Sequence, residues 1–316
     1  MNRLSLYISD SFDVFRNQAL ESYFLSEVRE GEVILYLWRN ENTVVIGKNQ
    51  DAYSECDVKT LEEENGCLAR RISGGGAVYH DTGNLNFTFL SSAEDFDVGR
   101  QDDVLLKALR DLGIRAEKNG RNDLLIDGRK FSGHAYHKGK KACLHHGTLM
   151  LEVDEEKMSK YLHVSKLKLR SKNVSSVKSR IINLKSVKED LNVAMLQEAL
   201  IKAAETVYGF SASRIAKIDE EKIEGLRKKF ADPSWRYGKT YEFPYMKEGR
   251  FDWGTVKVCF AMKEDVIEDA VIYSDALDET LFDGFARRLI GKKLSEAGSE
   301  KEEEREVISL MKEVEL

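Results

Sequence analysis

Two arginines and three consecutive glycines stand together at the start of the segment RRISGGGAVYHDTGNLNFTF, residues 70–89. Three glycines in a row cost backbone entropy on folding and bring no side chain to pack, so something must need the bare backbone. Glycine-rich turns direct backbone N–H groups into one concavity that binds anions, and Arg70 and Arg71 add forked donors for phosphate or carboxylate oxygens. The segment therefore predicts an anion site. No G-K-[ST] follows, so it is not a Walker A loop, and a glycine-rich hairpin with solvated arginines is the alternative.

Lys130 is the second residue whose position suggests chemistry. In DGRKFSGHAY it follows Asp127-Gly128, a favoured two-residue hairpin turn. Strand alternation then predicts that Lys130, Ser132 and His134 share one face and that Gly133 lies on the other. A lysine held on a strand can stabilise a developing oxyanion or phosphorane, whereas an ordinary exposed lysine is the alternative.

The expected partner strand begins with Arg121, Asn122 and Asp123. The carboxylate of Asp123 could bind a hard cation, Mg²⁺, that carries nucleotide phosphates. The alternative is that Asn122 and Asp123 form only a turn.

The histidines raise the question of a transition-metal site, with His134 and His137 or His145 and His146 as ligands. Adjacent histidines on a strand face opposite ways, and no acidic or cysteine partner recurs at ligand spacing. The sequence therefore favours His80 or His146 as pocket-lining hydrogen-bond donors. All six histidines fall within residues 80–163: His80, His134, His137, His145, His146 and His163.

Cys143 directly precedes a leucine and two histidines, so a cysteine–histidine nucleophile is a second reading of this region. Free cysteines are more often buried small hydrophobes than nucleophiles, and we favour the buried reading.

These residues need strands and helices to position them. Residues 32–47, EVILYLWRNENTVVIG, look like a hairpin that turns at NEN, and residues 84–89 alternate as on a half-buried strand. Apolar spacing and a late glycine predict a helix over residues 190–210.

The two prolines, Pro233 and Pro244, bracket a connector, which predicts domains of residues 1–244 and 245–316. In the second domain, the sequence predicts strands over residues 250–262 and 269–277, followed by helices over 279–291 and 302–316.

Composition narrows the class of protein. The 316 residues are 42% hydrophobic, which is ample for a packed core, and 49 basic residues against 55 acidic ones argue against general nucleic-acid binding. No stretch approaches the roughly 18 apolar residues of a membrane span, and the first residues lack the apolar core of a signal peptide. The four cysteines show no paired spacing. We therefore expect a cytoplasmic protein with no membrane or nucleic-acid partner.

Three blocks of the chain closely resemble the lipoate–protein ligase family: RRISGGGAVYHDTGNLNFTF, RNDLLIDGRKFSGHAYHKGKKACLHHGTLML and SSVKSRIINL. The likeness begins at YISDSFDVFRNQALE and continues through RFDWGTVKV, so it covers nearly the whole chain. It implies an α+β fold whose large catalytic domain has a mixed or antiparallel sheet, related to biotin ligases and class II aminoacyl-tRNA synthetases. A small α+β C-terminal accessory domain completes the expected architecture.

The resemblance also implies a two-step reaction. Lipoate and ATP, with Mg²⁺, give lipoyl-AMP and pyrophosphate, and a lysine of an acceptor protein then takes the lipoyl group. Acceptors in the family are the lipoyl domains of 2-oxoacid dehydrogenase complexes and the glycine-cleavage H protein.

Roles for individual residues follow from the same resemblance. Lys130 is the implied catalytic residue and touches both substrates, and Asp123 is the candidate for Mg²⁺. Residues 17–21 and Trp38 are expected to hold the lipoyl chain, and residues 166–180 resemble a loop that folds over the adenylate. The implied ATP-binding residues are Arg71, Gly76, Ala77, Val78, Tyr79 and Lys130, and the implied lipoate-binding residues are Lys130, Arg71, Ser73, Gly74, Gly75, His80 and His146.

The sequence departs from the family pattern at one position, and three alternative functions must be compared with the ligase. His137 stands where relatives can carry an arginine, which puts that arginine's carboxylate or phosphate contact in doubt. An ATP-independent octanoyl or lipoyl transferase would pass the acyl group through Cys143. A biotin ligase is disfavoured because its G-R-G-R-x-G signature is missing, and a non-catalytic lipoate-binding regulator is disfavoured because Lys130 is present.

The ligase and transferase hypotheses differ in what they require of Cys143. We expect Cys143→Ser to retain activity apart from small packing effects, because a ligase forms no covalent enzyme intermediate. The measurement is lipoyl transfer to an acceptor domain with and without ATP. A trapped acyl thioester on Cys143, or ATP-independent transfer abolished by the substitution, would favour the transferase.

Overall fold

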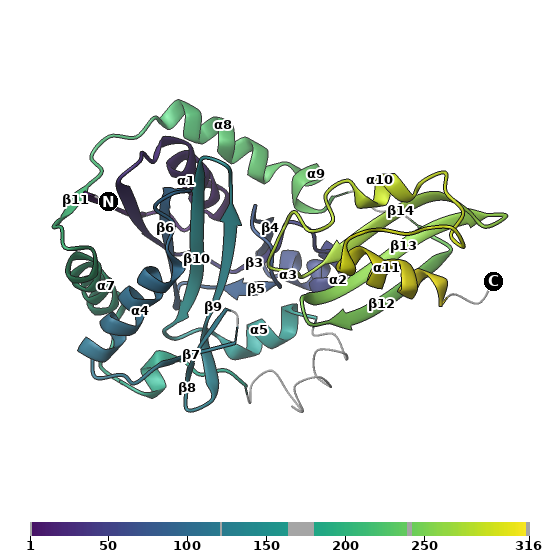
Figure 1. Cartoon of the computed structure of the whole chain (residues 1–316). Coiled ribbons are helices and arrows are strands. Elements are labelled where there is room, and N and C mark those ends of the chain that lie inside the picture. Colours follow the sequence, from purple (N-terminus) through teal and green to yellow (C-terminus); the bar gives the residue numbers. More distant parts are fainter. Residues whose placement is uncertain (1, 121, 164–179, 239–241, 314–316) are drawn as a thin grey trace.

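A mixed eight-stranded sheet forms the centre of the larger part of the molecule in this computed structural model, which describes residues 2–120, 122–163, 180–238 and 242–313. Its strand order is β11-β1-β2-β6-β10-β9-β8-β7 (Figure 1). The β1 strand pairs in parallel with β2 and β11, and the other pairs are antiparallel. The strands are β1 (Arg3–Ile8), β2 (Glu32–Trp38), β6 (Asn84–Ser92), β7 (Glu117–Asn119), β8 (Asp123–Ile126), β9 (Arg129–Lys138), β10 (Ala142–Met150) and β11 (Ala212–Arg214).

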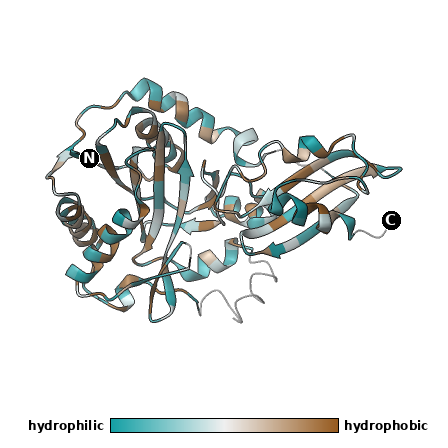
Figure 2. Ribbon diagram, in the orientation of Figure 1, coloured by the Kyte–Doolittle hydropathy of each residue, from teal (hydrophilic) through white to brown (hydrophobic). Residues whose placement is uncertain are grey.

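Helices cover both faces of this sheet, and the central strand β6 is buried along its whole length. On one face, Leu85, Phe87 and Phe89 enter a core with α4 (Val98–Asp111) and α7 (Val193–Tyr208). On the other face, α1 (Val14–Glu27) and α8 (Glu220–Ala231) pack together over the sheet. Figure 2 shows the alternation of hydrophobic and hydrophilic residues along helices such as α8. The polar residues of β6 therefore face α1, in the interior and not in solvent.

The expected hairpin over residues 32–47 is wrong. Its second half, β3 (Thr43–Ile46), leaves the large sheet and joins a three-stranded sheet with β4 (Cys67–Arg70) and β5 (Val78–His80). The physical reason is Asn40, which is buried in the presumed turn and bonded to Asn17 (Nδ2 to Oδ1, 3.0 Å) and to His80. These bonds anchor the turn in the interior. The helices α2 (Ala52–Glu55), α3 (Val58–Glu63) and α5 (Glu155–Tyr161) pack around this smaller sheet.

The C-terminal residues form an antiparallel sheet with its own apolar core. Its strands are β12 (Tyr245–Phe251), β13 (Gly254–Lys263) and β14 (Val266–Ser274), and its helices are α10 (Phe285–Leu289) and α11 (Glu302–Lys312). The helix expected over 279–291 shrinks to α10 because Gly284 and Gly291 have φ of 71° and 82°, which bound it on both sides. The α+β class and the small additional sheet domain are confirmed. Within the described ranges, no helix is long and apolar enough to cross a membrane.

A segment after β14 packs directly on the glycine run of residues 74–76. The Gly75 N–H donates to the carbonyl of Ala276 at 2.9 Å. A Cβ atom on Gly74 would lie 2.6 Å from the carbonyl oxygen of Leu277 and closer still to that of Ala276, so only glycine fits there. An ion pair between Lys257 of β13 and Asp51 (2.7 Å) also connects the C-terminal sheet with the larger part of the molecule.

Gly74→Ala is expected to loosen this docking, because the added methyl group cannot coexist with the two backbone carbonyls. The radius of gyration from small-angle X-ray scattering should increase and the melting temperature should fall. Gly225→Ala is the matched control: Gly225 lies within α8 with nothing near its absent Cβ, so alanine should stabilise the fold by roughly 0.5–1 kcal/mol. An unchanged scattering profile for Gly74→Ala would contradict the docking described here.

Candidate active site

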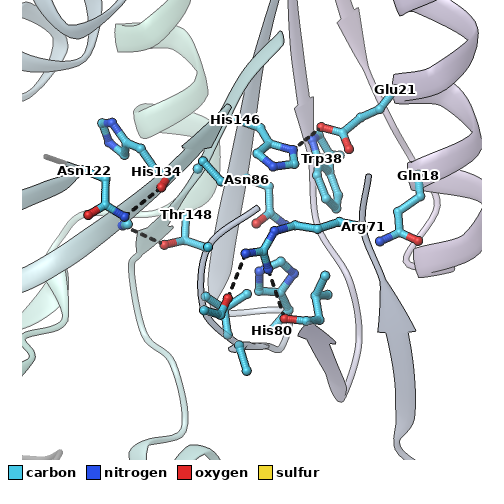
Figure 3. Close-up of a pocket in the computed structure, with 18 of the residues that line it drawn as sticks. Gln18, Glu21, Trp38, Arg71, His80, Asn86, Asn122, His134, His146 and Thr148 are labelled. Atoms are coloured by element: carbon cyan, nitrogen blue, oxygen red, sulfur yellow. Dashed lines mark hydrogen bonds and ion pairs between the residues drawn. The ribbon is translucent and has the colours of Figure 1, made fainter. Parts of the chain in front are cut away.

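A cavity of about 110 Å³ lies between the glycine run and the α1 face of the large sheet. Its floor is a row of neighbouring residues across the strands: Trp38 of β2 opposes Asn86 of β6, and Asn86 opposes Thr148 of β10. Thr148 Oγ1 in turn accepts the N–H of Gly133 on β9 (3.2 Å). In Figure 3, Asn122 and His134 lie at one end and Gln18, Glu21 and Trp38 at the other, with Arg71 between. The cavity is lined by Gln18, Glu21, Trp38, Val45, Arg71, Gly75, Gly76, Ala77, Val78, His80, Asn86, Asn122, Lys130, Gly133, His134, Ala135, His146, Gly147 and Thr148.

A β-bulge decides where Lys130 points. Lys130 pairs with Leu125 while Ser132 pairs with Leu124, so β9 carries one residue more than β8 between these pairs. The expectation that Lys130 and Ser132 share a face is therefore wrong: Lys130 lies on the cavity face with Gly133. A Cβ atom on Gly133 would lie 2.6 Å from Lys130 Nζ, so the lysine side chain crosses the strand where the glycine leaves room.

The ammonium group of Lys130 is held by Asp123, at 2.6 Å from Nζ to Oδ1. Asp123 lies across the ladder from Gly133, so the pair fixes a positive charge at the cavity wall. Asn122 locks the end of β8 against β9 by donating to the His134 carbonyl (2.9 Å) and accepting its N–H (2.8 Å). Arg121 lies outside the described residues.

Arg71 is buried and organises the glycine run around itself. Its guanidinium donates to the carbonyls of Gly74 (2.6 Å) and Gly76 (2.8 Å), and to Val45 (3.2 Å) on β3. Burial lowers the pKa of Arg71 to about 10, which leaves it charged at neutral pH. Arg70, in contrast, donates to the carbonyls of residues 47, 48 and 50 and does not line the cavity.

A chain of hydrogen bonds connects Arg71 with a buried carboxylate on α1. Arg71 Nε donates to Ser73 Oγ (3.0 Å), and Ser73 Oγ lies 2.7 Å from His146 Nε2. His146 Nδ1 lies 2.8 Å from Glu21 Oε1, which also accepts from Thr88. If Ser73 donates to His146 Nε2 and His146 Nδ1 donates to Glu21, every donor of this chain meets an acceptor. Ser73 therefore positions the ring of His146, which lines the cavity, through the hydrogen bond at Nε2.

His80 is fully enclosed, and its ring packs edge-on against Trp38 at 6.1 Å between centroids. Its Nδ1 faces the amide nitrogen of Asn40 at 3.0 Å. Nδ1 is therefore assigned as the acceptor of this hydrogen bond, and the ring proton of the neutral imidazole is on Nε2. Burial, chiefly, and the charge of Arg71 lower the pKa of His80 to about 3. The ring is neutral at physiological pH.

Most of the predicted site residues come together here. Gly74 contacts the C-terminal segment, and Ser73 lies behind His146. Tyr79 points into the core beside Tyr161, where its hydroxyl donates to Asn42 (3.1 Å). The predicted residues that line the cavity are Arg71, Gly75, Gly76, Ala77, Val78, His80, Lys130 and His146.

Sequence reasoning missed Asn86 and Thr148, and it did not single out Gln18. The available signal for Asn86 is the polar half of NLNFTF, which lies opposite the apolar face of the expected half-buried strand. Gln18 lies within the residues 17–21 that were assigned to the lipoyl chain, but it is amide-polar and not apolar.

The two histidine pairs that we considered and disfavoured as metal ligands do not form within the described part of the chain. Instead His134 and His145 meet on the α4 side of the sheet, 3.0 Å apart, with Asp102 near them. Gln101 lies 3.0 Å from His145 Nδ1 and Ser132 lies 3.0 Å from His134 Nε2, so hydrogen bonds satisfy both rings. Burial lowers the pKa of both histidines.

Two further residues lie away from the cavity. Cys143 is buried, its pKa is raised by burial, and its thiol contacts the Gly139 carbonyl at 3.7 Å. His137, which stands in place of the relatives' arginine, contacts Glu279 of the C-terminal part (Nδ1 to Oε1, 2.6 Å). Here His137 joins the two parts of the molecule.

Two family models match the chain. The lipoyl protein ligase A/B catalytic domain matches residues 13–205, and the bacterial lipoate protein ligase C-terminus matches residues 240–301. The chain therefore belongs to the lipoate–protein ligase family, and the predicted family and ligase class are confirmed.

Individual relatives agree. Proteins named lipoate-protein ligase A are 39% identical over 278 residues in Psychrobacter cryohalolentis (84% of this chain, 82% of that one) and 38% over 301 residues in Blochmanniella pennsylvanica (92% and 89%). The lipoate complex of P. falciparum LipL1 has a TM-score of 0.82 at 28% identity and covers 97% of this chain and 98% of that one. A lipoate-protein ligase A bound with ATP has a TM-score of 0.63 at 26% identity, covering 75% and 98%. The bipartite ligase described with its E2 lipoyl domain from Thermoplasma acidophilum scores 0.64 at 28%, covering 77% and 99%.

The lowered pKa of His80 predicts acid sensitivity. Its folded pKa of about 3 lies below the unfolded value near 6.5, so its contribution to stability is complete above pH 6.5 and is lost as pH falls toward 3. His80→Gln should therefore reduce the slope of unfolding free energy against pH by up to about 1.4 kcal/mol per pH unit between pH 6 and 4. Urea unfolding over this range provides the measurement. Equal slopes in the two proteins would show that His80 is not buried as a neutral ring.

Proposed function

We propose that this chain is an ATP-dependent, AMP-forming lipoate–protein ligase. The observation that carries the proposal is a fixed cation, Lys130 held by Asp123 over Gly133, in one cavity with Arg71 and the glycine run. The lipoate-bound and ATP-bound relatives support both substrates. A lysine without this setting would be an ordinary surface residue.

In the first step, a lipoate carboxylate oxygen attacks the α-phosphorus of ATP. The new P–O bond gives lipoyl-AMP, and the bond to the β-phosphate breaks to release pyrophosphate. Both reactants are anions, so the reaction needs a positive charge between them, and Lys130 supplies it without moving. Proposed contacts to ATP come from Arg71, Lys130 and the backbone of residues 76–79. Proposed contacts to lipoate come from Lys130, Arg71, Ser73, Gly74, Gly75, His80 and His146, with Ser73 acting through His146 and Gly74 through its carbonyl, which accepts from Arg71.

In the second step, a neutral acceptor lysine attacks the acyl carbon of lipoyl-AMP. An amide bond forms, the bond to AMP breaks, and the amine loses a proton. Lys130 can polarise the acyl carbonyl, so holding the reactants in place is the main contribution of the chain. The proposed acceptors are the lipoyl domains of 2-oxoacid dehydrogenases, which the relative with an E2 lipoyl domain supports, and the glycine-cleavage H protein.

The fit of Mg²⁺ to Asp123 can be tested on its contacts. One carboxylate oxygen bonds Lys130, and among the described residues the other has no hydrogen-bond or ion-pair partner, so it is available to a cation. Magnesium bound mainly through nucleotide phosphates typically takes one or two protein carboxylates, so the residue fits as a single ligand. Bound there, the ion would neutralise phosphate charge.

The C-terminal residues 245–316 are proposed as an accessory domain that covers the site. Ala276 and Leu277 lie on the glycine run, and Glu279 contacts His137 on β9. A mixed anhydride must be sheltered from water and then reached by a protein-borne lysine. A domain attached through a few polar contacts can do both in turn. The scattering experiment on Gly74→Ala tests this attachment.

The transferase and the non-catalytic regulator remain the rival functions. Cys143 lies outside the cavity with a raised pKa, which disfavours a thiolate nucleophile. A regulator would not need the Lys130–Asp123 pair. Lipoate-dependent exchange of pyrophosphate into ATP separates the ligase from both rivals, because only a ligase catalyses it.

Lys130→Met should abolish most of this exchange, a loss of at least a hundredfold, because the methionine keeps the stem and removes the charge. The melting temperature should hardly change, since Lys130 is partly exposed. Lys138→Met, at the exposed end of the same strand, is the control and should retain activity. Near-normal exchange by the Lys130 variant would remove this residue from the mechanism.

A further inference from the structure

Three buried side chains of metal-ligand type meet on the face of the large sheet that packs against α4. Asp102 comes from α4, His134 from β9 and His145 from β10, and each residue is 3% exposed or less. One carboxylate oxygen and one nitrogen of each ring lie within 4.8 Å of one another. His134 and His145 are diagonal neighbours across two paired strands, because His134 pairs with Gly147. The three ligand atoms therefore converge where three elements join.

Hydrogen bonds on the outer side of this cluster fix both imidazole rings. Gln101 Oε1 lies 3.0 Å from His145 Nδ1, and an amide oxygen only accepts, so the ring proton of His145 is assigned to Nδ1. Its Nε2 therefore presents a lone pair toward His134 Nδ1, 3.0 Å away. Ser132 Oγ holds the second ring at His134 Nε2, also at 3.0 Å. Histidines that bind a metal ion are usually oriented in this way by a partner at the other nitrogen.

Hydrogen bonding within the cluster satisfies the two rings but not the carboxylate. A proton on His134 Nδ1 would serve His145 Nε2, whereas Asp102 Oδ1 lies 3.5 Å from that nitrogen, beyond the usual N–H···O range. Asp102 Oδ1 is buried and has no hydrogen-bond partner among the residues that the structure describes. A buried acceptor without a donor costs free energy, which a bound cation would offset.

The separations suit a transition-metal ion. Zn²⁺ holds histidine nitrogens and carboxylate oxygens at about 2.0–2.2 Å, so two ligands of a tetrahedral site lie roughly 3.3–3.5 Å apart. The two ring nitrogens are 3.0 Å apart, and Asp102 Oδ1 is 3.5 Å from the nearer one. Two nitrogen ligands favour zinc over Mg²⁺ or Ca²⁺, which take oxygen ligands. Three protein ligands leave the fourth position to water.

Lys118 of β7 gives the cluster a connection to solvent. Its ammonium bonds the other oxygen of Asp102, and its side chain is 41% exposed, whereas that of Asp102 is 5% exposed. The lysine can turn into water when a dication binds, and the carboxylate then offsets part of the charge of the ion. Lys118 thus competes with a metal ion for Asp102.

We infer that Asp102, His134 and His145 form a binding site for a divalent transition-metal ion, with Zn²⁺ as the expected occupant. The ion joins α4 to β9 and β10 and stiffens the strand that carries Lys130. Its role is structural, because both rings lie on the α4 face of the sheet and the substrates are proposed on the α1 face. It is separate from the Mg²⁺ proposed at Asp123.

The experiment uses the full chain, stripped of metal by a chelator and then titrated with Zn²⁺ alone. Calorimetry should show one Zn²⁺ bound per chain with a dissociation constant in the micromolar range or tighter. Bound zinc should raise the melting temperature, since it binds the folded chain. Co²⁺ in place of zinc should give the strong visible absorption of four-coordinate cobalt.

Substitutions locate the bound ion. Asp102→Asn and His145→Gln should each weaken zinc binding by roughly tenfold or more, because each removes a ligand. Lys118→Met should strengthen it by roughly threefold, because a half-exposed competing ion pair is lost. His163→Gln is the matched control, since His163 is exposed and outside the cluster, and it should bind zinc as wild type does.

Other outcomes contradict the inference. No saturable zinc binding, or binding that both ligand variants retain, would leave the cluster as a hydrogen-bonded part of the core. Weaker binding by Lys118→Met would also count against it. If the ligand variants fail to fold, anomalous diffraction at the zinc edge from zinc-soaked wild-type crystals decides: a peak between the three ligand atoms supports the site, and peaks only elsewhere overturn it. None of these measurements depends on the proposed ligase activity.

Discussion

The site depends on one buried charge. Arg71 can stay ionised in the interior only because backbone carbonyls and a hydroxyl surround its guanidinium. The glycine run supplies two of those carbonyls and takes its shape from them. The same guanidinium bonds Val45 of the small sheet and, through Ser73 and His146, the carboxylate of Glu21 on α1. The glycine run, the small sheet and α1 are thereby held around one cavity.

The arrangement changes the interpretation of the three glycines. From sequence, the bare backbone suggested direct approach by a ligand. The structure shows that another part of the chain also approaches it, since Ala276 and Leu277 touch Gly74 and Gly75. Closure of the C-terminal part and the shape of the cavity roof thus depend on the same few backbone atoms.

Sequence reasoning succeeded where the signal was local. Asp127-Gly128 forms the expected turn, with φ of 49° and 73°, and the helix over 190–210 appears as α7, ended by Gly209 at φ 77°. Residues 71–80 that reach the cavity lie close to one another in the chain, so their grouping could be predicted, whereas Lys130 and His146 join them only through the resemblance to the family.

Failures arose where distant residues decide the outcome. No local pattern reveals that Asn40 is anchored inside by Asn17 and His80, so the sequence over 32–47 predicts a hairpin that does not form. Asn86 and Thr148 become neighbours only through pairing of β6 with β10. His134 and His145 meet because β9 and β10 align, although the pairs considered from sequence lay closer in the chain.

The bulge in β9 decides on which side of the sheet Lys130 lies. If β9 kept its length but paired regularly with β8, Lys130 would share a face with Ser132, because side chains alternate with period two. The ammonium would then turn toward the apolar core beneath α4, while every residue type known from the motif remained in place. The position of the ammonium therefore depends on an irregular pairing that no residue type in the motif reveals.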